Sequence, residues 1–139
     1  MPASILIIDD EPHIRQSFAS LLGDEGYRAM AAESVEAAAS LRRRQTFDLI
    51  LLDLQLPGES GLDFLKRLRQ EPGPPLVLVI SGQADIPMAL EAVRLGAIDF
   101  LEKPVQPEKL LVSVKTALDL AVAQRQRSRR AHAGDLPDQ

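Results

Sequence analysis

The chain has no cysteine, no apolar segment of membrane length and no excess of basic charge. Without cysteine it can form no disulfide, no thiolate metal site and no cysteine nucleophile. Its apolar runs fall far short of the roughly 20 residues that a spanning helix needs. No basic and then apolar leader precedes the first run, so a secretory signal is not expected. The formal net charge of −4 disfavours nucleic acid as a partner of this domain. We therefore expect a soluble, cytoplasmic protein that does not associate with a membrane.

Short apolar runs alternate with helical patterns along the chain, which predicts β-α-β units and a parallel sheet. The expected strands are Ser4–Ile8, Tyr27–Ala32, Asp48–Leu52, Leu76–Ile80 and Ile98–Leu101. Right-handed crossovers place helices on both faces of such a sheet. The predicted fold is α/β, a flavodoxin-like doubly wound five-stranded parallel sheet of order 2-1-3-4-5 with five helices. The strand order is taken by analogy with other doubly wound sheets.

The chain divides into a folded domain and a short basic end. We expect residues 1–123 to form the domain and residues 124–139 to form a basic helix end, followed by a flexible tail or the start of a linker. Four arginines and no acid lie between Gln124 and Arg130. Such a run is more often a solvated helix end than a nucleic-acid contact. Within the domain, Ser34 and Asp85 are placed to cap the second and fourth helices.

Four of the apolar runs end in polar residues of the types that phosphoryl-transfer chemistry uses. These are Asp9 and Asp10, Asp53, Ser81, and Lys103 followed by Pro104. The carboxyl ends of parallel strands share one rim, where ligands bind in open α/β sheets. Carboxylates of this kind suit Mg2+, and an aspartate can accept a phosphoryl group while a metal neutralises charge. The turn after Asp53 would also let the backbone carbonyl of Gln55 face this site.

Each of these residues also has a simpler explanation when it is considered alone. The Asp9-Asp10 pair precedes a helix and could serve as its N-cap. Asp53 could cap a loop, and Ser81 could be an ordinary turn residue. A single lysine such as Lys103 is usually a solvated surface charge. It is improbable, however, that four strand ends would carry residues of related chemistry for four separate and unrelated reasons.

The motifs that carry these residues resemble those of two-component response-regulator receiver domains. They are Ile7-Ile8-Asp9-Asp10-Glu11, Leu51-Leu52-Asp53-Leu54-Gln55-Leu56-Pro57-Gly58, Ser81-Gly82 and Glu102-Lys103-Pro104. The resemblance extends from about Ser4 to Ala121. It implies that Asp53 accepts a phosphoryl group from a sensor histidine kinase. It further implies that Asp10, Asp53 and the Gln55 carbonyl ligate Mg2+ directly, and that Asp9 acts mainly through water.

The resemblance also assigns switch residues. Ser81 would bind the phosphoryl oxygens and move towards them, and Lys103 would contact the phosphate. The bond from Lys103 to Pro104 would be cis. Phe100 stands at the position of the family's aromatic switch residue, and because it has no hydroxyl only ring rotation remains to it. The chain would then be a regulatory phosphoacceptor domain rather than an enzyme.

Two stretches are similar to a narrower group, the receivers of nitrogen-regulation-type, sigma-54-dependent activators and of related nitrogen-fixation regulators. These stretches are Ser81–Ala89 and Gly96–Pro104. That likeness implies an output domain beyond residue 139, which would control transcription. A stand-alone receiver, or a degenerate one that serves as a protein-docking module, is the alternative. A haloacid-dehalogenase-type phosphatase would need a general acid at Gln55, and an amide cannot supply one.

The fifth helix carries a candidate surface for self-association. From Glu108 to about Arg127 it would be roughly 30 Å long. Its apolar stripe has alternating three- and four-residue spacing, as a coiled-coil seam does. The stripe consists of Leu111, Val114, Leu118 and Ala121. We expect Leu118, Ala121 and Val122 to lack an intramolecular partner, and hence a weak homodimer through this helix.

Overall fold

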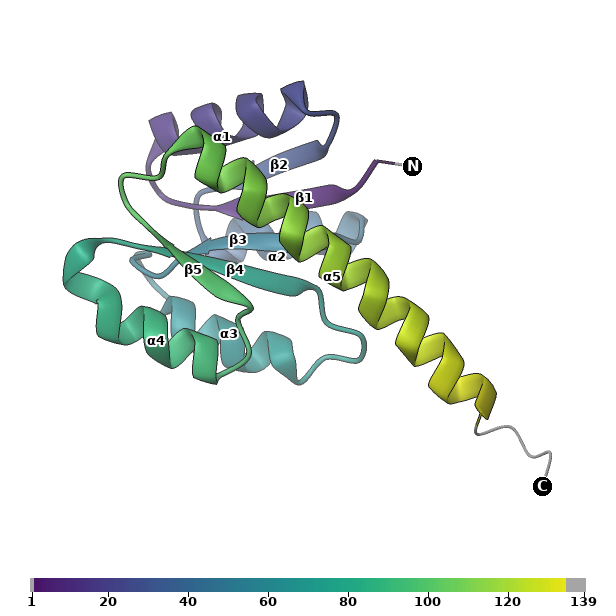
Figure 1. Ribbon diagram of the computed structural model, residues 1–139. Coiled ribbons are helices and arrows are strands. Elements are labelled where there is room, and N and C mark those ends of the chain that lie inside the picture. The colour runs from purple at the N-terminus through teal and green to yellow at the C-terminus, as the bar shows by residue number, and fades with distance from the viewer. Residues whose placement is uncertain (1, 135–139) are drawn as a thin grey trace.

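The computed structural model describes residues 2–134, with the side chains of the last helix described as far as residue 127. Within these residues, five strands and five α-helices alternate (Figure 1). The strands are β1 Ser4–Ile8, β2 Arg28–Ala32, β3 Leu49–Asp53, β4 Leu76–Ser81 and β5 Asp99–Glu102. The helices are α1 Pro12–Asp24, α2 Val35–Arg44, α3 Gly61–Arg69, α4 Ile86–Arg94 and α5 Pro107–Gly134, with a 3-10 turn at Gln83–Asp85.

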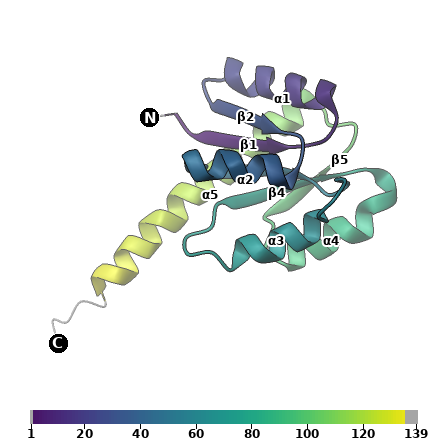
Figure 2. The same ribbon diagram turned by 180° about the vertical axis from the view of Figure 1, so that it is seen from behind.

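All the strand pairs are parallel, and the sheet order is β2-β1-β3-β4-β5. Helices α1 and α5 cover one face of the sheet, and α2, α3 and α4 cover the other, as the view from behind shows (Figure 2). Strands β1, β3 and β4 lie inside the sheet and are almost wholly buried. The predicted fold and strand order are confirmed, and each strand boundary lies within one residue of its predicted place.

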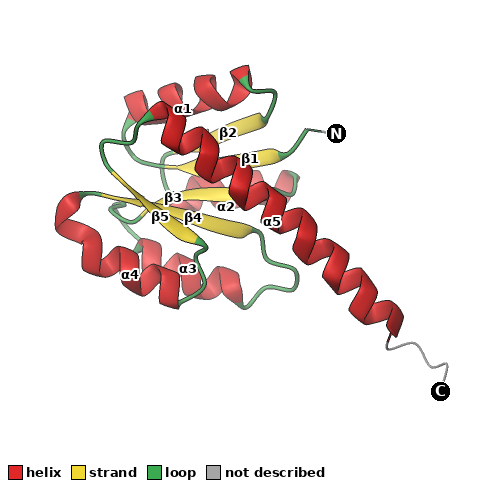
Figure 3. Cartoon of the chain, in the orientation of Figure 1, coloured by secondary structure: helices red, strands yellow, loops and turns green. Residues whose placement is uncertain are grey.

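The core lies in two layers because successive side chains of a strand point to opposite faces. Leu6 and Ile8 of β1 face α2, α3 and α4, whereas Ile5 and Ile7 face α1 and α5. All four are fully buried. A strand that is apolar on both faces must end where the helices no longer cover it. The polar residues at the carboxyl ends of these strands therefore gather at one edge of the core, where the yellow strands of Figure 3 pass into green loops.

The helix ends follow the sequence in part. Ser34 caps α2, as predicted, by accepting a hydrogen bond from the N–H of Ala37 at 3.0 Å. Asp85 occupies the N-cap position of α4, but its side chain makes no capping hydrogen bond there. The prediction that it caps this helix is therefore wrong, because its carboxylate accepts a hydrogen bond from Gln55 at 2.7 Å instead.

Helix α5 is longer than the sequence predicted. It continues to Gly134, so the residues after Arg130 begin as helix rather than as an irregular tail. Its 28 residues span about 42 Å at 1.5 Å per residue. The yellow end of the helix projects beyond the sheet (Figure 1). The rest of the predicted tail, residues 135–139, lies outside the described residues.

The apolar stripe of α5 is used mostly within the domain. Val114 is fully buried, and Leu111, Leu118 and Ala121 pack against the core layer shared with α1. The expectation that Leu118 and Ala121 lack an intramolecular partner is therefore wrong. Val122, by contrast, is 46% exposed. Among the helices of residues 2–134, none is long and apolar enough to cross a membrane.

Candidate functional site

The sheet register places the predicted residues on one rim. Ile8 pairs with Leu52, so Asp9 and Asp53 follow neighbouring positions on β1 and β3. Asp53 pairs with Ile80, the residue before Ser81. Ser81 in turn pairs with Glu102, the residue before Lys103. The carboxyl ends of four strands thus bring together the residues that the sequence had spread over almost a hundred positions.

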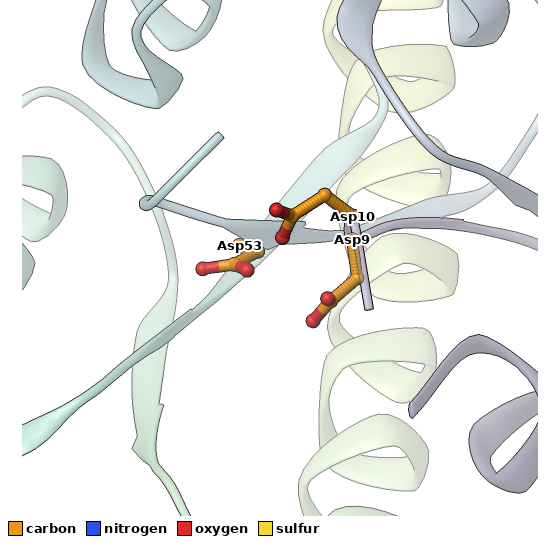
Figure 4. A group of neighbouring side chains, drawn as sticks. All are labelled: Asp9, Asp10 and Asp53. Atoms are coloured by element: carbon orange, nitrogen blue, oxygen red, sulfur yellow. The ribbon is translucent and has the colours of Figure 1, made fainter. Parts of the chain in front are cut away.

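Three carboxylates form the centre of this rim. Each of Asp9, Asp10 and Asp53 offers an oxygen, and these atoms lie within 4.8 Å of one another. Figure 4 shows the three side chains gathered around one space at the ends of β1 and β3. Asp9 and Asp53 are each only 1% exposed, whereas Asp10 is exposed to solvent. Two buried acids and one exposed acid make a strongly negative pocket that is open on one side.

Lys103 supplies the opposing charge. Its Nζ lies 3.2 Å from Asp53 Oδ2, 3.2 Å from Glu11 Oε1 and 3.4 Å from Asp9 Oδ2. The side chain is only 21% exposed, so Lys103 is not the solvated surface charge of the simpler explanation. One ammonium facing three carboxylates leaves a net negative charge. The site therefore attracts a further cation.

Two neighbours of the site were not predicted from the sequence. Glu11 pairs with Lys103, and its backbone N–H donates to Asp9 Oδ1 at 2.8 Å. Arg15 of α1 donates from its guanidinium to the backbone carbonyl of Asp9 at 2.8 Å. The position of Glu11, directly after two aspartates, was the available signal for an acid near this pocket. Nothing in the local sequence indicates that Arg15, four residues after Glu11, reaches back to the carbonyl of Asp9.

Burial and neighbouring charges shift the pKa values of Asp53 and Lys103. Loss of solvation raises the pKa of Asp53 from 3.8 to about 6, and the nearby Asp9 carboxylate adds to the rise. The hydrogen bond from the Gln55 N–H and the charge of Lys103 oppose the rise without cancelling it. For Lys103, burial favours the neutral amine, but the attraction of Asp53 and Asp9 outweighs it and leaves the pKa above its usual value. Lys103 therefore stays charged at neutral pH.

The remaining predicted residues lie around this centre. Ser81 is fully buried, and its hydroxyl has no hydrogen-bond partner among the described residues. The backbone N–H of Gln55 donates to Asp53 Oδ1 at 2.9 Å. The bond between Lys103 and Pro104 is cis, as the family resemblance implied. Phe100 is partly buried and packs against the core layer of α2, α3 and α4.

The donor set fits a hard divalent cation. Asp9 Oδ2 is buried and makes no hydrogen bond within the described part of the chain, although Lys103 lies 3.4 Å away. Such an orphaned carboxylate oxygen calls for another partner. Carboxylate oxygens in an open pocket are the ligands that Mg2+ takes, since it keeps several waters and completes its shell with substrate oxygens. The acidic pocket can therefore bind a metal ion.

Comparison with known proteins shows similarity over nearly the whole chain. Residues 5–115 match the family model of the response regulator receiver domain. The transcriptional regulatory protein FixJ of Azorhizobium caulinodans is 37% identical, and the alignment covers 96% of this chain and 65% of that protein. The nitrogen assimilation regulatory protein NtrX of the same organism is 38% identical over 86% of this chain and 27% of its own length.

Comparison with solved structures gives the same result as comparison with these relatives. The crystal structure of NtrX from Brucella abortus matches with a TM-score of 0.86 and 35% identity, over 93% of this chain and 29% of that one. NtrX, a nitrogen assimilation regulatory protein, bears out the narrower likeness to nitrogen-regulation-type receivers. The chain spans between 25% and 65% of the length of curated relatives such as these. The strand order, the acidic rim and these matches lead to one conclusion: the chain belongs to the response regulator receiver domain family.

Proposed function

We propose that Asp53 accepts a phosphoryl group from a sensor histidine kinase, and that the domain thereby controls an output. The observation that carries the proposal is the position of Asp53. Its buried carboxylate lies beside Asp9 and Asp10 and 3.2 Å from the Lys103 ammonium. A carboxylate so placed can approach a phosphoryl group while a cation and an ammonium offset the negative charge.

The transfer itself is a displacement at phosphorus. An oxygen of the ionised Asp53 carboxylate forms the new P–O bond, and the P–N bond of the kinase phosphohistidine breaks. The electron pair of that bond returns to the imidazole of the kinase. The Gln55 N–H, 2.9 Å from Asp53 Oδ1, orients the carboxylate. Lys103 stabilises the charge that accumulates on the phosphoryl oxygens.

The metal in this proposal is Mg2+. Asp10, Asp53 and the Gln55 carbonyl would hold it directly, and Asp9 would act mainly through water. Bound there, the ion would neutralise charge between the carboxylates and the incoming phosphoryl group. The clustering of three carboxylate oxygens within 4.8 Å supports this assignment.

The response to phosphorylation would pass through Ser81 and Phe100. The Ser81 hydroxyl is buried without a partner among the described residues, and a phosphoryl oxygen would give it one. Movement of Ser81 at the end of β4 would then let the Phe100 ring rotate on β5. The surface formed by α4, β5 and α5 would change as a result. Relatives such as FixJ are transcriptional regulatory proteins, which supports an output domain beyond residue 139 and transcription, in the cytoplasm, as the controlled process.

A degenerate or stand-alone receiver that acts only as a docking module is the alternative function. A degenerate receiver would be expected to have lost at least one rim residue, and here the three acids, the hydroxyl and the ammonium are all present.

Weak self-association through α5 is also part of the proposal. Since Leu118 and Ala121 pack inside the domain, Val122 is the exposed large apolar residue that a second copy would meet between residues 118 and 127 of α5. The arginines that follow it would keep the pairing weak.

Phosphate uptake tests the proposal. The protein is treated with acetyl phosphate and Mg2+, and its intact mass is measured. The mass should rise by one phosphate in the parent protein and not in Asp53→Asn. Labelling of the Asp53→Asn variant to the parent level would refute the assignment. Omission of Mg2+ should abolish or strongly slow the uptake.

A further inference from the structure

Gln55 and Asp85 join the two segments that flank the phosphoryl-transfer rim. Gln55 lies between β3 and α3, and Asp85 ends the 3-10 turn before α4. Gln55 Nε2 donates a hydrogen bond to Asp85 Oδ1 at 2.7 Å. Among the described residues, no other side-chain hydrogen bond links these two segments directly. The Gln55–Asp85 bridge therefore ties the loop of the phosphoacceptor to the start of α4.

The bridge lies beside the reacting carboxylate. The backbone N–H of Gln55 is bound to Asp53 Oδ1 at 2.9 Å, which fixes this residue next to the phosphoacceptor. At the other end, the backbone N–H of Asp85 donates to the carbonyl of Gly82 at 3.0 Å. A Cβ on Gly82 would lie 3.7 Å from Asp85 Oδ2, so the carboxylate lies close to the residue that follows Ser81. The bridge thus joins the loop that follows Asp53 to the turn that follows Ser81.

A capping role does not explain the position of the Asp85 side chain. Aspartate is among the best N-cap residues, and Asp85 occupies the N-cap of α4. Its carboxylate nevertheless makes no capping hydrogen bond. It accepts a hydrogen bond from the Gln55 amide instead. The Asp85 side chain therefore takes part in the bridge and does not cap the helix.

We propose that Asp85 is a positioning residue that holds the Gln55 amide away from the phosphoryl site in the unphosphorylated protein. After phosphorylation of Asp53, the Gln55 amide leaves Asp85 and donates its hydrogen bond to the phosphoryl group. The proposal rests on the function proposed above. A phosphoryl group adds about −1.5 to −2 charge and three strong acceptor oxygens. It repels the Asp85 carboxylate and offers the Gln55 amide a more highly charged acceptor. The exchange unlinks the start of α4 from the phosphoacceptor loop.

A bridge that is present only in the unphosphorylated protein must lower the affinity for a phosphoryl group, because binding of that group has to break the bridge. The net contribution of one such hydrogen bond corresponds to roughly a 2- to 10-fold change in affinity. Asp85→Ala removes the bridge but also removes a negative charge. Asp85→Asn is the matched control, since it removes the charge and keeps an acceptor for the Gln55 amide.

The test uses beryllofluoride, a mimic of the phosphoryl group, with Mg2+ present and its affinity measured by NMR titration. Asp85→Ala should bind the mimic roughly 2- to 10-fold more tightly than Asp85→Asn. In a Gln55→Ala background the two Asp85 variants should bind equally. Gln83→Ala, an exposed change in the same 3-10 turn, should bind like the parent and controls for disturbance of the loop.

Two results would overturn the bridge while leaving the phosphoacceptor intact. One is equal affinity of Asp85→Ala and Asp85→Asn when Gln55 is present. The other is a difference between them that persists in Gln55→Ala. If the parent protein itself failed to bind beryllofluoride, the proposed function would fall together with the bridge, so the two failures are distinguishable.

Discussion

Replacing Asp53 with asparagine should stabilise the metal-free protein at neutral pH. The Asp53 carboxylate is only 1% exposed, and it has Asp9 and Asp10 as neighbours. Its pKa is raised from 3.8 to about 6, chiefly because burial disfavours the charged form. Asparagine has nearly the same shape and carries no charge, so Asp53→Asn removes the unfavourable ionisation and leaves the packing in place.

The magnitude follows from the two pKa values. At about 1.36 kcal/mol per pH unit, a rise from 3.8 to about 6 corresponds to about 3 kcal/mol. The folded state holds this proton more tightly than the unfolded state does. The stabilisation from the protonated group is therefore fully present below pH 3.8 and is lost as the pH rises through about 6. Solvent screens this effect little, because the carboxylate is buried. Asp53→Asn should thus gain up to about 3 kcal/mol over the parent at about pH 7.5, and almost nothing near pH 4.

Urea denaturation at pH 4, 5, 6 and 7.5 in the presence of a chelator measures this difference. Asp24→Asn, at the exposed end of α1, removes one charge far from the rim and should show no such pH-dependent gain. Millimolar Mg2+ should restore stability to the parent more than to Asp53→Asn. A parent protein that is more stable than Asp53→Asn at pH 7.5 without metal would show that the buried Asp53 charge does not destabilise the fold. So would a difference that does not change between pH 4 and pH 7.5.

Three further changes test other parts of the account. Asp10→Ala should lose Mg2+ binding in calorimetric titration yet keep or gain thermal stability without metal, since one of three clustered carboxylates is gone; a clear loss of stability would mean that Asp10 is chiefly a structural cap. Lys103→Ala should still take up phosphate but show smaller chemical-shift responses at Phe100 and along α4, and responses equal to those of the parent would show that Lys103 does not couple the site to β5. Val122→Glu should weaken a concentration-dependent dimer in sedimentation equilibrium, whereas Val112→Glu, nearer the start of α5, should weaken it less; a strictly monomeric parent would rule out this interface.

The fold could be predicted because its main signals are local. Residues Leu76–Ile80 of β4, for example, form a continuous apolar run, and such runs separated by helical patterns can be arranged in few ways. The length of α5 could not be predicted in the same way. Its last turns have no apolar periodicity, and helix propensity alone did not indicate that the backbone continues to Gly134. Whether Leu118 packs inside the domain depends on where α1 lies, and the position of α1 is a feature of the tertiary structure that the local sequence does not determine.

The members of the site could be predicted for a related reason. A polar residue at the end of a buried strand must lie at the rim, whatever the loops do, so Asp53 and Lys103 were placed by the topology. Their contacts were harder to foresee. Pairing of Lys103 with Glu11 depends on how the chain turns into α1. The Gln55–Asp85 bridge joins residues 30 positions apart, and the sequence near Asp85 indicated a helix cap instead.

Chemical location of the phosphoryl group determines which residue is the phosphoacceptor. The protein is phosphorylated with acetyl phosphate and Mg2+ and then treated with borohydride, which reduces an aspartyl phosphate to homoserine. Peptide sequencing by mass spectrometry should then find homoserine at position 53 and aspartate at positions 9 and 10. Homoserine at either of those two positions, or a phosphate that resists borohydride and remains on Ser81, would contradict the assignment of Asp53 as the phosphoacceptor.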